Sequence, residues 1–383
     1  MNFDSMPIQN QLTAWVLRKT ATAGVRRVVS LSAAIASEIG NVRNENQDRA
    51  VISRGWDKQG RDYTVVAVAD GIGGMRDGAT CAAMAISTFL ATVYQQAQGV
   101  SDSTEDWIRK AVTAANKAVF AKFHGDGGST LVALLIRPGH SVCWLSVGDS
   151  RVYRSTGKNL TQISVDDTIA GQLGKNHEKT PEQSQLLQFI GVGDELEPHI
   201  AKLEPLQTKL DYEPADAVVL TTDGVHFLDL STGLLGQIVS NAPDPGMCVK
   251  RLVDLAKWCG GPDNATVAMI AISANQASDE RPPYLCLEVW DAFGELQIIA
   301  NETAREASPI ADQSSTTLPE AGKSISTQAN GNQPIKPKRE IAKVPRNKKE
   351  TRKAKSPTGK RDKAESPETE EPQLLMGFSS KSN

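Results

Sequence analysis

The chain has 383 residues, of which 39% are hydrophobic, and a formal net charge of −3. This length suits one large domain with extensions or two ordinary domains. Apolar runs such as residues 130–136 are far shorter than the roughly 18 to 20 residues that span a bilayer, so we expect no transmembrane segment. We also expect no secretion signal, because the N-terminus lacks a basic start followed by an apolar stretch.

The chain carries five cysteines, which are scattered and form no CxxC pair. An odd number without metal-site or disulfide spacing favours buried free thiols in a reducing compartment. We therefore expect a cytoplasmic protein.

The first 28 residues are weakly patterned and are treated as an N-terminal extension. From residue 29 to about residue 275 the pattern is that of a single folded domain. Helical stretches are expected at residues 77–96, 104–123, 234–240 and 246–258. Strand signals occur at residues 64–69, 129–136, 141–147, 151–154, 160–163, 217–221 and 265–272. Their close spacing favours antiparallel meanders, so we expect an α+β fold of two packed antiparallel sheets flanked by helical pairs.

The C-terminal third divides into two further segments. Residues 276–302 are expected to add a β-hairpin that turns near Phe293 and Gly294. Residues 303–383 are rich in Ser, Thr, Pro, Lys and Glu and almost free of aromatic residues. Such a composition cannot bury enough apolar surface to offset the ordering entropy, so we expect a disordered tail.

The tail is also strongly basic. Residues 336–363 contain thirteen Lys or Arg and only three Asp or Glu, so the rest of the chain is acidic. Three interpretations stay open: a solvated tail with no dedicated partner, docking to an acidic partner such as the chain's own body, or binding to nucleic acid or an anionic membrane. Nucleic acid is disfavoured because no aromatic residues interleave with the basic ones for base stacking.

Several aspartates sit at the ends of expected strands. Asp70 closes a hydrophobic strand and precedes the glycine-rich turn 71–74, and Asp223 repeats this arrangement before Gly224. Asp263 enters just ahead of the strand at 265–272. Each pair of this kind could be an ordinary turn. Together, however, carboxylates without neighbouring histidine or cysteine suit hard cations such as Mg²⁺ or Mn²⁺, and a nearby arginine suits chemistry on phosphate.

Taken in order, these short blocks resemble the protein phosphatase 2C (PP2C, also PPM) family of serine/threonine phosphatases, in its bacterial form. The resemblance covers roughly residues 30–274. The blocks that carry it are Arg43 with Asn46-Gln-Asp48, Asp70-Gly-Ile-Gly-Gly74, Gly128-Ser-Thr130, Gly148-Asp-Ser-Arg151, Leu160-Thr161, Thr222-Asp-Gly224 and Asp263-Asn264.

The resemblance implies two Mg²⁺ or Mn²⁺ ions at one end of the sandwich. Asp70 would bridge the two ions, and the carbonyl of Gly71 would complete the shell of one. Asp223 and Asp263 would ligate the other ion. The remaining implied roles are the first or second metal shell for Asp48, phosphate binding for Arg43 and a third, weaker metal for Asp149.

The implied reaction is hydrolysis of phosphoserine or phosphothreonine on partner proteins, in opposition to a cognate Ser/Thr kinase. A hydroxide bridging the two cations would attack phosphorus in line, without a cysteine or serine nucleophile. Ile72 stands where some members carry a histidine acid. Phe227 stands where a carboxylate sometimes supports the third metal. Residues 164–193 match the family's mobile flap, with Asp166-Asp167-Thr168 in place of the commoner Asp-His-Ser/Thr.

A regulatory pseudophosphatase that binds phosphoproteins without turnover is the alternative from another functional class. Retention of Arg43, Asp70, Asp223 and Asp263 together argues against it. The sequence therefore predicts an active phosphatase.

Overall fold

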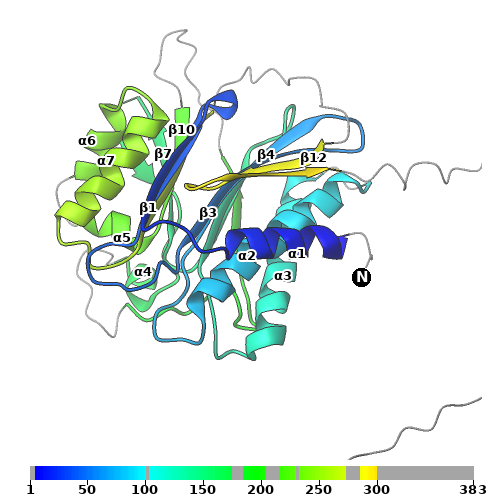
Figure 1. The fold of residues 1–383 in the computed structure, drawn as a ribbon, viewed down its shortest axis with the longest axis horizontal. Coiled ribbons are helices and arrows are strands. Elements are labelled where there is room, and N and C mark those ends of the chain that lie inside the picture. Colours follow the sequence, from blue (N-terminus) through cyan, green and yellow to red (C-terminus); the bar gives the residue numbers. More distant parts are fainter. Residues whose placement is uncertain are drawn as a thin grey trace, which may run out of the picture. The chain divides into compact units, whose positions relative to one another are not determined.

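Two antiparallel β-sheets lie face to face in the computed structural model (Figure 1). The description covers residues 5–100, 103–157, 159–174, 184–203, 216–229, 233–272 and 285–299. The six-stranded sheet has the order β1 (Ala23–Val28), β2 (Ala33–Glu38), β11 (Ala265–Ile272), β10 (Asp216–Thr221), β7 (Arg151–Thr156), β8 (Asn159–Gln162). The seven-stranded sheet has the order β13 (Glu295–Ile299), β12 (Leu285–Trp290), β3 (Arg49–Trp56), β4 (Asp62–Ala69), β5 (Leu131–Ile136), β6 (Cys143–Val147), β9 (His199–Lys202).

Helices cover the outer face of each sheet (Figure 1). The seven-stranded sheet is covered by α2 (Gly78–Ala97) and α3 (Thr104–Phe123), with α1 (Ser5–Val16) packed on α2. The six-stranded sheet is covered by α6 (Leu234–Ser240) and α7 (Pro245–Trp258). Short helical turns complete the described elements: η1 (Val29–Leu31), α4 (Ile169–Gln172), α5 (Asp223–His226) and η2 (Phe227–Asp229). This arrangement confirms the predicted α+β fold of two antiparallel sheets with flanking helices.

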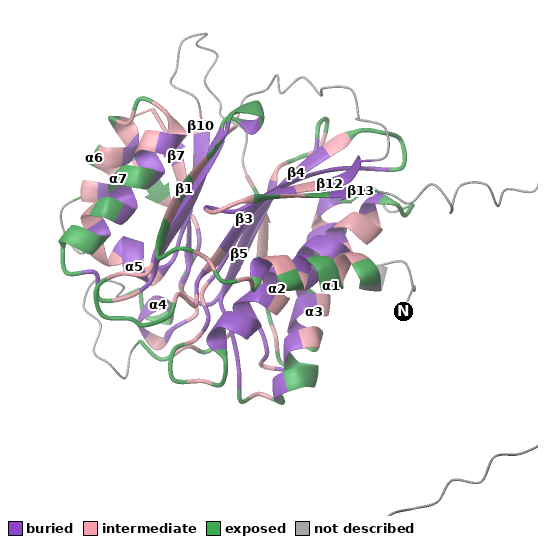
Figure 2. Cartoon of the chain, viewed as in Figure 1, coloured by how far each residue is buried: buried purple, intermediate pink, exposed green. Residues whose placement is uncertain are grey.

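Three apolar layers hold these four structural layers together, and Figure 2 shows the buried strands between the helices. Strand β4 shows how one strand serves two of them. Val65 and Ala67 face the helices α2 and α3, whereas Val66 and Val68 face the other sheet. This alternation follows from the two-residue period of a strand, and it is why β4 reads as a continuous apolar run.

The segments at the two ends of the described chain contact each other. The guanidinium of Arg18, which follows α1, donates two hydrogen bonds to Asp291 at 2.7 and 2.9 Å. It also lies over the ring of Trp15, 4.0 Å from the centroid. Asp291 in turn accepts the backbone N–H groups of Phe293 and Gly294 in the turn between β12 and β13. The segment after the N-terminal helix is therefore held against the turn of the β12–β13 hairpin, which forms the edge of the seven-stranded sheet.

Local signals predicted some elements better than others. Helix α3 begins and ends where its pattern indicated, and the side chain of Ser103 caps it by accepting the N–H of Asp106. The cysteine prediction was wrong for one residue, since four cysteines are buried and Cys259 is exposed. The predicted tail, residues 303–383, lies outside the described residues. No helix in the described part is long and apolar enough to cross a membrane.

Candidate active site

The predicted site residues lie at one end of both sheets, and strand register explains why. Arg49 pairs with Ala69, so the start of β3 and the end of β4 lie side by side, with Asp48 and Asp70 just beyond them. Thr221 pairs with Arg151 and with Val267, which places the end of β10 beside the starts of β7 and β11. Loops from both sheets therefore meet at the same end of the sandwich.

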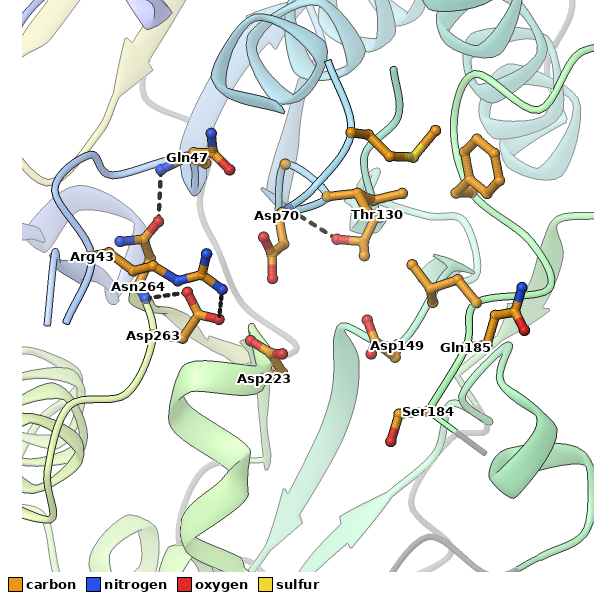
Figure 3. Close-up of a pocket in the computed structure, with 16 residues that line it drawn as sticks. Arg43, Gln47, Asp70, Thr130, Asp149, Ser184, Gln185, Asp223, Asp263 and Asn264 are labelled. Carbon is orange, nitrogen blue, oxygen red and sulfur yellow. Dashed lines mark hydrogen bonds and ion pairs between the residues drawn. The ribbon is translucent and has the colours of Figure 1, made fainter. Parts of the chain in front are cut away.

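A cavity of about 460 Å³ opens between these loops (Figure 3). Five of the predicted side chains line it: Arg43, Asp70, Asp149, Asp223 and Asp263. Gly71 lines it as well. Figure 3 shows Arg43 and Asp263 at one side, Ser184 and Gln185 at the other, and the remaining aspartates between them. Residues from widely separated parts of the sequence thus share one pocket, and it has the size of an ordinary ligand site.

The loop after β4 is fixed through its backbone. The N–H of Asp70 donates to Oγ1 of Thr130 at 2.9 Å, and its carbonyl accepts the N–H of Thr130 at 2.8 Å. Gly71 lies against Gly78, and a methyl group added to Gly71 would meet the Gly78 backbone. Only glycine permits this close approach. The turn therefore leaves the Asp70 carboxylate directed into the pocket (Figure 3).

Asp48 lies behind the pocket instead of lining it. Its side chain is buried, and Oδ2 accepts the hydroxyl of Thr222 at 2.9 Å. Among the described residues no donor reaches Oδ1. Burial raises the pKa of this carboxyl to about 7, with a further contribution from the nearby charge of Asp223. Such a carboxylate is kept charged most easily by a neighbouring cation.

Asp70 has a similar electrostatic problem. Burial and then the negative charges of Asp48 and Asp223 raise its pKa well above the ordinary value. Like charges gathered in one place repel unless a cation lies among them. The site therefore has the electrostatics of a cation site.

Arg43 is placed by one of the predicted metal ligands. Its guanidinium donates to Oδ2 of Asp263 at 2.7 Å, across 220 positions of sequence. This hydrogen bond is the largest cause of the raised pKa of Arg43. Oδ1 of Asp263 accepts the N–H of Asn264, so the carboxylate is held on both oxygens. The pair places a cationic side chain at the rim of the pocket.

Asn264 has a function that the sequence did not predict. Its side-chain oxygen accepts the N–H of Gln47 at 2.8 Å, and its amide nitrogen donates to the carbonyls of Ile39 and Glu45. One side chain at the start of β11 thereby fixes the loop that carries Arg43 and Asp48. Thr130 and Thr222 hold the loops of Asp70 and Asp48 in the same way. All three residues lie in the short sequence motifs named above, but a position in a motif does not by itself predict which loop a side chain will hold.

The oxygen atoms around the pocket match what the implied cations prefer. The carboxylates of Asp70, Asp149, Asp223 and Asp263 suit hard divalent ions, and Oδ1 of Asp48 is a buried oxygen that no described residue satisfies. No three Asp, Glu, His or Cys side chains in the described ranges are drawn together around one point. Ions that keep part of their water shell and take one or two carboxylates each fit such spacing, as Mg²⁺ does. The residues present therefore fit the implied ions.

Part of the pocket lining is apolar. Ile72, Met75, Leu186 and Phe189 form this part, and none of them was predicted as a site residue. Two of them come from the turn after β4 and two from the end of residues 164–193. No periodic pattern connects these positions in the sequence.

At the start of the 164–193 segment lies a buried ion pair. Arg151 donates to both carboxylate oxygens of Asp166, at 2.9 and 2.8 Å, and the Asp166 side chain is fully buried. Next to it, Oδ2 of Asp167 accepts the N–H of Gly148 at 2.9 Å. Burial raises the pKa of Asp167 to about 6. The Asp-Asp-Thr sequence therefore anchors this segment to the loop that carries Asp149.

Known proteins are similar to this chain in sequence and in fold. The model of the family described as protein phosphatase 2C matches residues 41–244. Protein phosphatase PhpP of Streptococcus pneumoniae is 26% identical over 63% of this chain and 98% of its own length. Serine/threonine phosphatase stp of Listeria welshimeri is 26% identical over 63% of this chain and 95% of its own.

Two solved structures show the same architecture. The catalytic domain of the phosphatase PstP, in complex with two manganese ions, is 27% identical with a TM-score of 0.50 over 66% of this chain and all of its own. The serine/threonine phosphatase of S. agalactiae, at 22% identity, has a TM-score of 0.53 over 63% of this chain and 99% of its own. The pocket, the ordered blocks and these matches agree, and the chain belongs to the protein phosphatase 2C family.

Proposed function

We propose that this protein hydrolyses phosphoserine and phosphothreonine on partner proteins with two divalent cations bound in the pocket. The proposal rests on one observation: buried or partly buried carboxylates from both sheets meet around a cavity whose described lining has Arg43 as its one cationic side chain. Support comes from the family and from the two manganese ions bound by PstP.

The residues that would hold the cations are those named from the sequence. Asp70, Gly71, Asp223 and Asp263 all line the pocket. Asp48 would act from behind, and Asp149 could join a third ion. When bound, the two cations would supply an attacking hydroxide and offset negative charge on the transferring phosphoryl oxygens.

The chain's own side chains orient the substrate. Arg43 would bind the phosphate of the substrate through two parallel N–H groups, which is the geometry that a guanidinium offers. Its hydrogen bond to Asp263 fixes the direction of approach. The cysteines do not line the pocket within the described residues, and so they take no part in the proposed reaction.

The test compares wild type with Asp223→Asn on a phosphothreonine peptide, with Mn²⁺ or Mg²⁺ and with a chelator as control. Activity should require the metal and should fall at least about 1000-fold in the variant, since metal-supplied stabilisation of the transition state is worth several kcal/mol. Metal-replete wild type without activity on several phosphopeptides would overturn the proposal. Neither the described residues nor the comparisons favour the non-catalytic alternative.

The proposal also covers the location of the enzyme, its opposing kinase and the segments outside the catalytic site. We place the enzyme in the cytoplasm, opposing a Ser/Thr kinase, with a phosphatase domain at residues 29–275 and a hairpin segment at 276–302. The basic tail at 303–383 would bind an acidic partner. Salt-sensitive binding that disappears on deletion of the tail would support this last point.

A further inference from the structure

The active-site pocket has two chemically different sides. Arg43, Asp263 and Asn264 lie at one side, and Ser184 and Gln185 mark the other in Figure 3. The lining also includes an apolar wall, defined here as Ile72, Met75, Leu186 and Phe189. Each of these four side chains is only partly buried. Such a surface offers no hydrogen-bond donor or positive charge to a phosphate group.

Two residues of the apolar wall, Ile72 and Phe189, pack against the backbone of Gly128. A methyl group placed on Gly128 would lie 2.5 Å from Cδ2 of Phe189 and 2.9 Å from Cδ1 of Ile72. Both side chains therefore rest on the bare backbone of Gly128. Both side chains are only partly buried and line the pocket, so part of their apolar surface is accessible from it.

Backbone pairing connects the apolar wall to the turn after β4, which contains Gly71. Ser129 pairs with Gly71 on one side and with Ile190 on the other, and it exchanges two hydrogen bonds with Ile190 at 3.1 and 2.8 Å. The buried Asn116 of α3 accepts the N–H of Gly191 and donates to the carbonyl of Gly193. The residue that follows Phe189 is thus fixed relative to Gly71, a predicted metal ligand.

We propose that the apolar wall binds an aliphatic or aromatic side chain directly adjacent to the phosphorylated residue of the substrate, so that substrates with an apolar neighbour are preferred. This inference rests on the proposed phosphatase function. The occupant is defined by continuity, because the wall and the phosphate-binding side belong to one cavity of about 460 Å³. A cavity of this size has room for a phosphorylated side chain and one neighbouring side chain.

The experiment uses two phosphothreonine peptides that differ only in the flanking residues, which are Leu in one and the similarly sized Asn in the other. The readout is the ratio of their kcat/KM values, because a general loss of activity cancels in it. Wild type should prefer the Leu peptide by about tenfold, which is the effect of partly burying one such side chain. Peptides with a single Leu before or after the phosphothreonine then locate the position.

A matched pair of variants tests the wall itself. Leu186→Asn should bring the ratio close to one. Leu187→Asn changes the next residue, which is 45% exposed and does not line the pocket, and should leave the ratio as in wild type. Equal shifts in the two variants would overturn the inference.

Other outcomes separate the two proposals. Hydrolysis of p-nitrophenyl phosphate and of both peptides at equal efficiency would overturn the apolar subsite and leave the phosphatase intact. A change in Leu186→Asn that affects only phosphothreonine against phosphoserine would show that the wall contacts the methyl group of the phosphoresidue itself, which also overturns it. No hydrolysis of any substrate with Mn²⁺ would remove both proposals.

Discussion

Buried carboxylates occur in two regions of this molecule and are treated in opposite ways. At the start of the 164–193 segment, Asp166 receives two hydrogen bonds from Arg151 and another from Gln162. At the pocket end of the sheets, Asp48 receives one hydrogen bond, from Thr222. Its other carboxylate oxygen has no donor among the described residues. In the first region the carboxylate charge is balanced by an arginine of the protein. In the second region the protein supplies too few donors, and a bound cation would balance the charge.

The difference shows how a site can be distinguished from structure. A buried ion pair stabilises a segment only if both partners are present, and breaking it is costly. A cluster of carboxylates without cations works against the fold and is retained for function. The same residue type therefore predicts opposite effects on stability and activity, depending on its partners.

Asp70→Asn gives the largest expected effect. Activity should fall at least about 1000-fold, equivalent to about 4 kcal/mol of transition-state stabilisation. The free energy of unfolding in chelator should stay the same or rise by about 1 kcal/mol, because a carboxyl with a raised pKa loses its charge. Steady-state kinetics and chemical denaturation measure the two. A clear loss of stability would contradict the comparison.

Asp166→Asn should do the opposite. Replacing one partner of a buried pair leaves Arg151 with an uncompensated charge and should cost roughly 3 kcal/mol of unfolding free energy. Activity per folded molecule should fall far less than in Asp70→Asn. Urea denaturation measures the loss. Stability equal to wild type would mean that the two regions do not differ in the way described.

The pH dependence of stability sharpens the comparison further. The Asp48 carboxyl, with a pKa of about 7 in the folded protein, binds a proton that the unfolded chain releases near pH 4. The folded state therefore holds more protons between these values, and the metal-free protein should lose on the order of 1 kcal/mol of stability as pH rises from 6 to 8. Denaturation in chelator at both pH values tests this. Asp48→Asn should weaken the dependence, and the part that remains belongs to Asp70 and Asp167, whose pKa values are also raised.

A surface pair sets the lower limit. Lys250 and Asp254 form an exposed ion pair one turn apart on α7. Neither residue belongs to the pocket lining or to the Arg151–Asp166 pair. Asp254→Asn should change the free energy of unfolding by about 0.3 to 0.5 kcal/mol. The same denaturation assay applies. A change as large as that of Asp166→Asn would show that burial does not separate the classes.

Local signals in the sequence predicted more of this molecule than its long-range contacts. The strand just before Asp70 and the helix at residues 104–123 depend on neighbouring residues, and both are present. Strand β2, with the sequence AAIASE, was missed because most of its residues are weak strand formers, and its burial between β1 and β11 stabilises it instead.

The site divides in the same way. The order of the motifs predicted five of the side chains that line the pocket. It did not predict the contact between Arg43 and Asp263, which lie 220 residues apart in the sequence. The apolar wall has no sequence signal, because Ile72 and Phe189 meet only through the bare backbone of Gly128. Such contacts depend on packing between elements and leave no local periodicity.

The hairpin β12–β13 also affects how the molecule behaves beside other copies of itself. Strand β12 pairs with residues 52–55 of β3, a strand that is buried along almost its whole length. Without the hairpin, β3 would present unpaired backbone groups and apolar side chains to any passing chain, the usual start of aggregation. The outer strand β13 presents a more exposed surface with the charged Glu295. A phosphatase cut short before residue 285 should therefore self-associate, and light scattering would detect it.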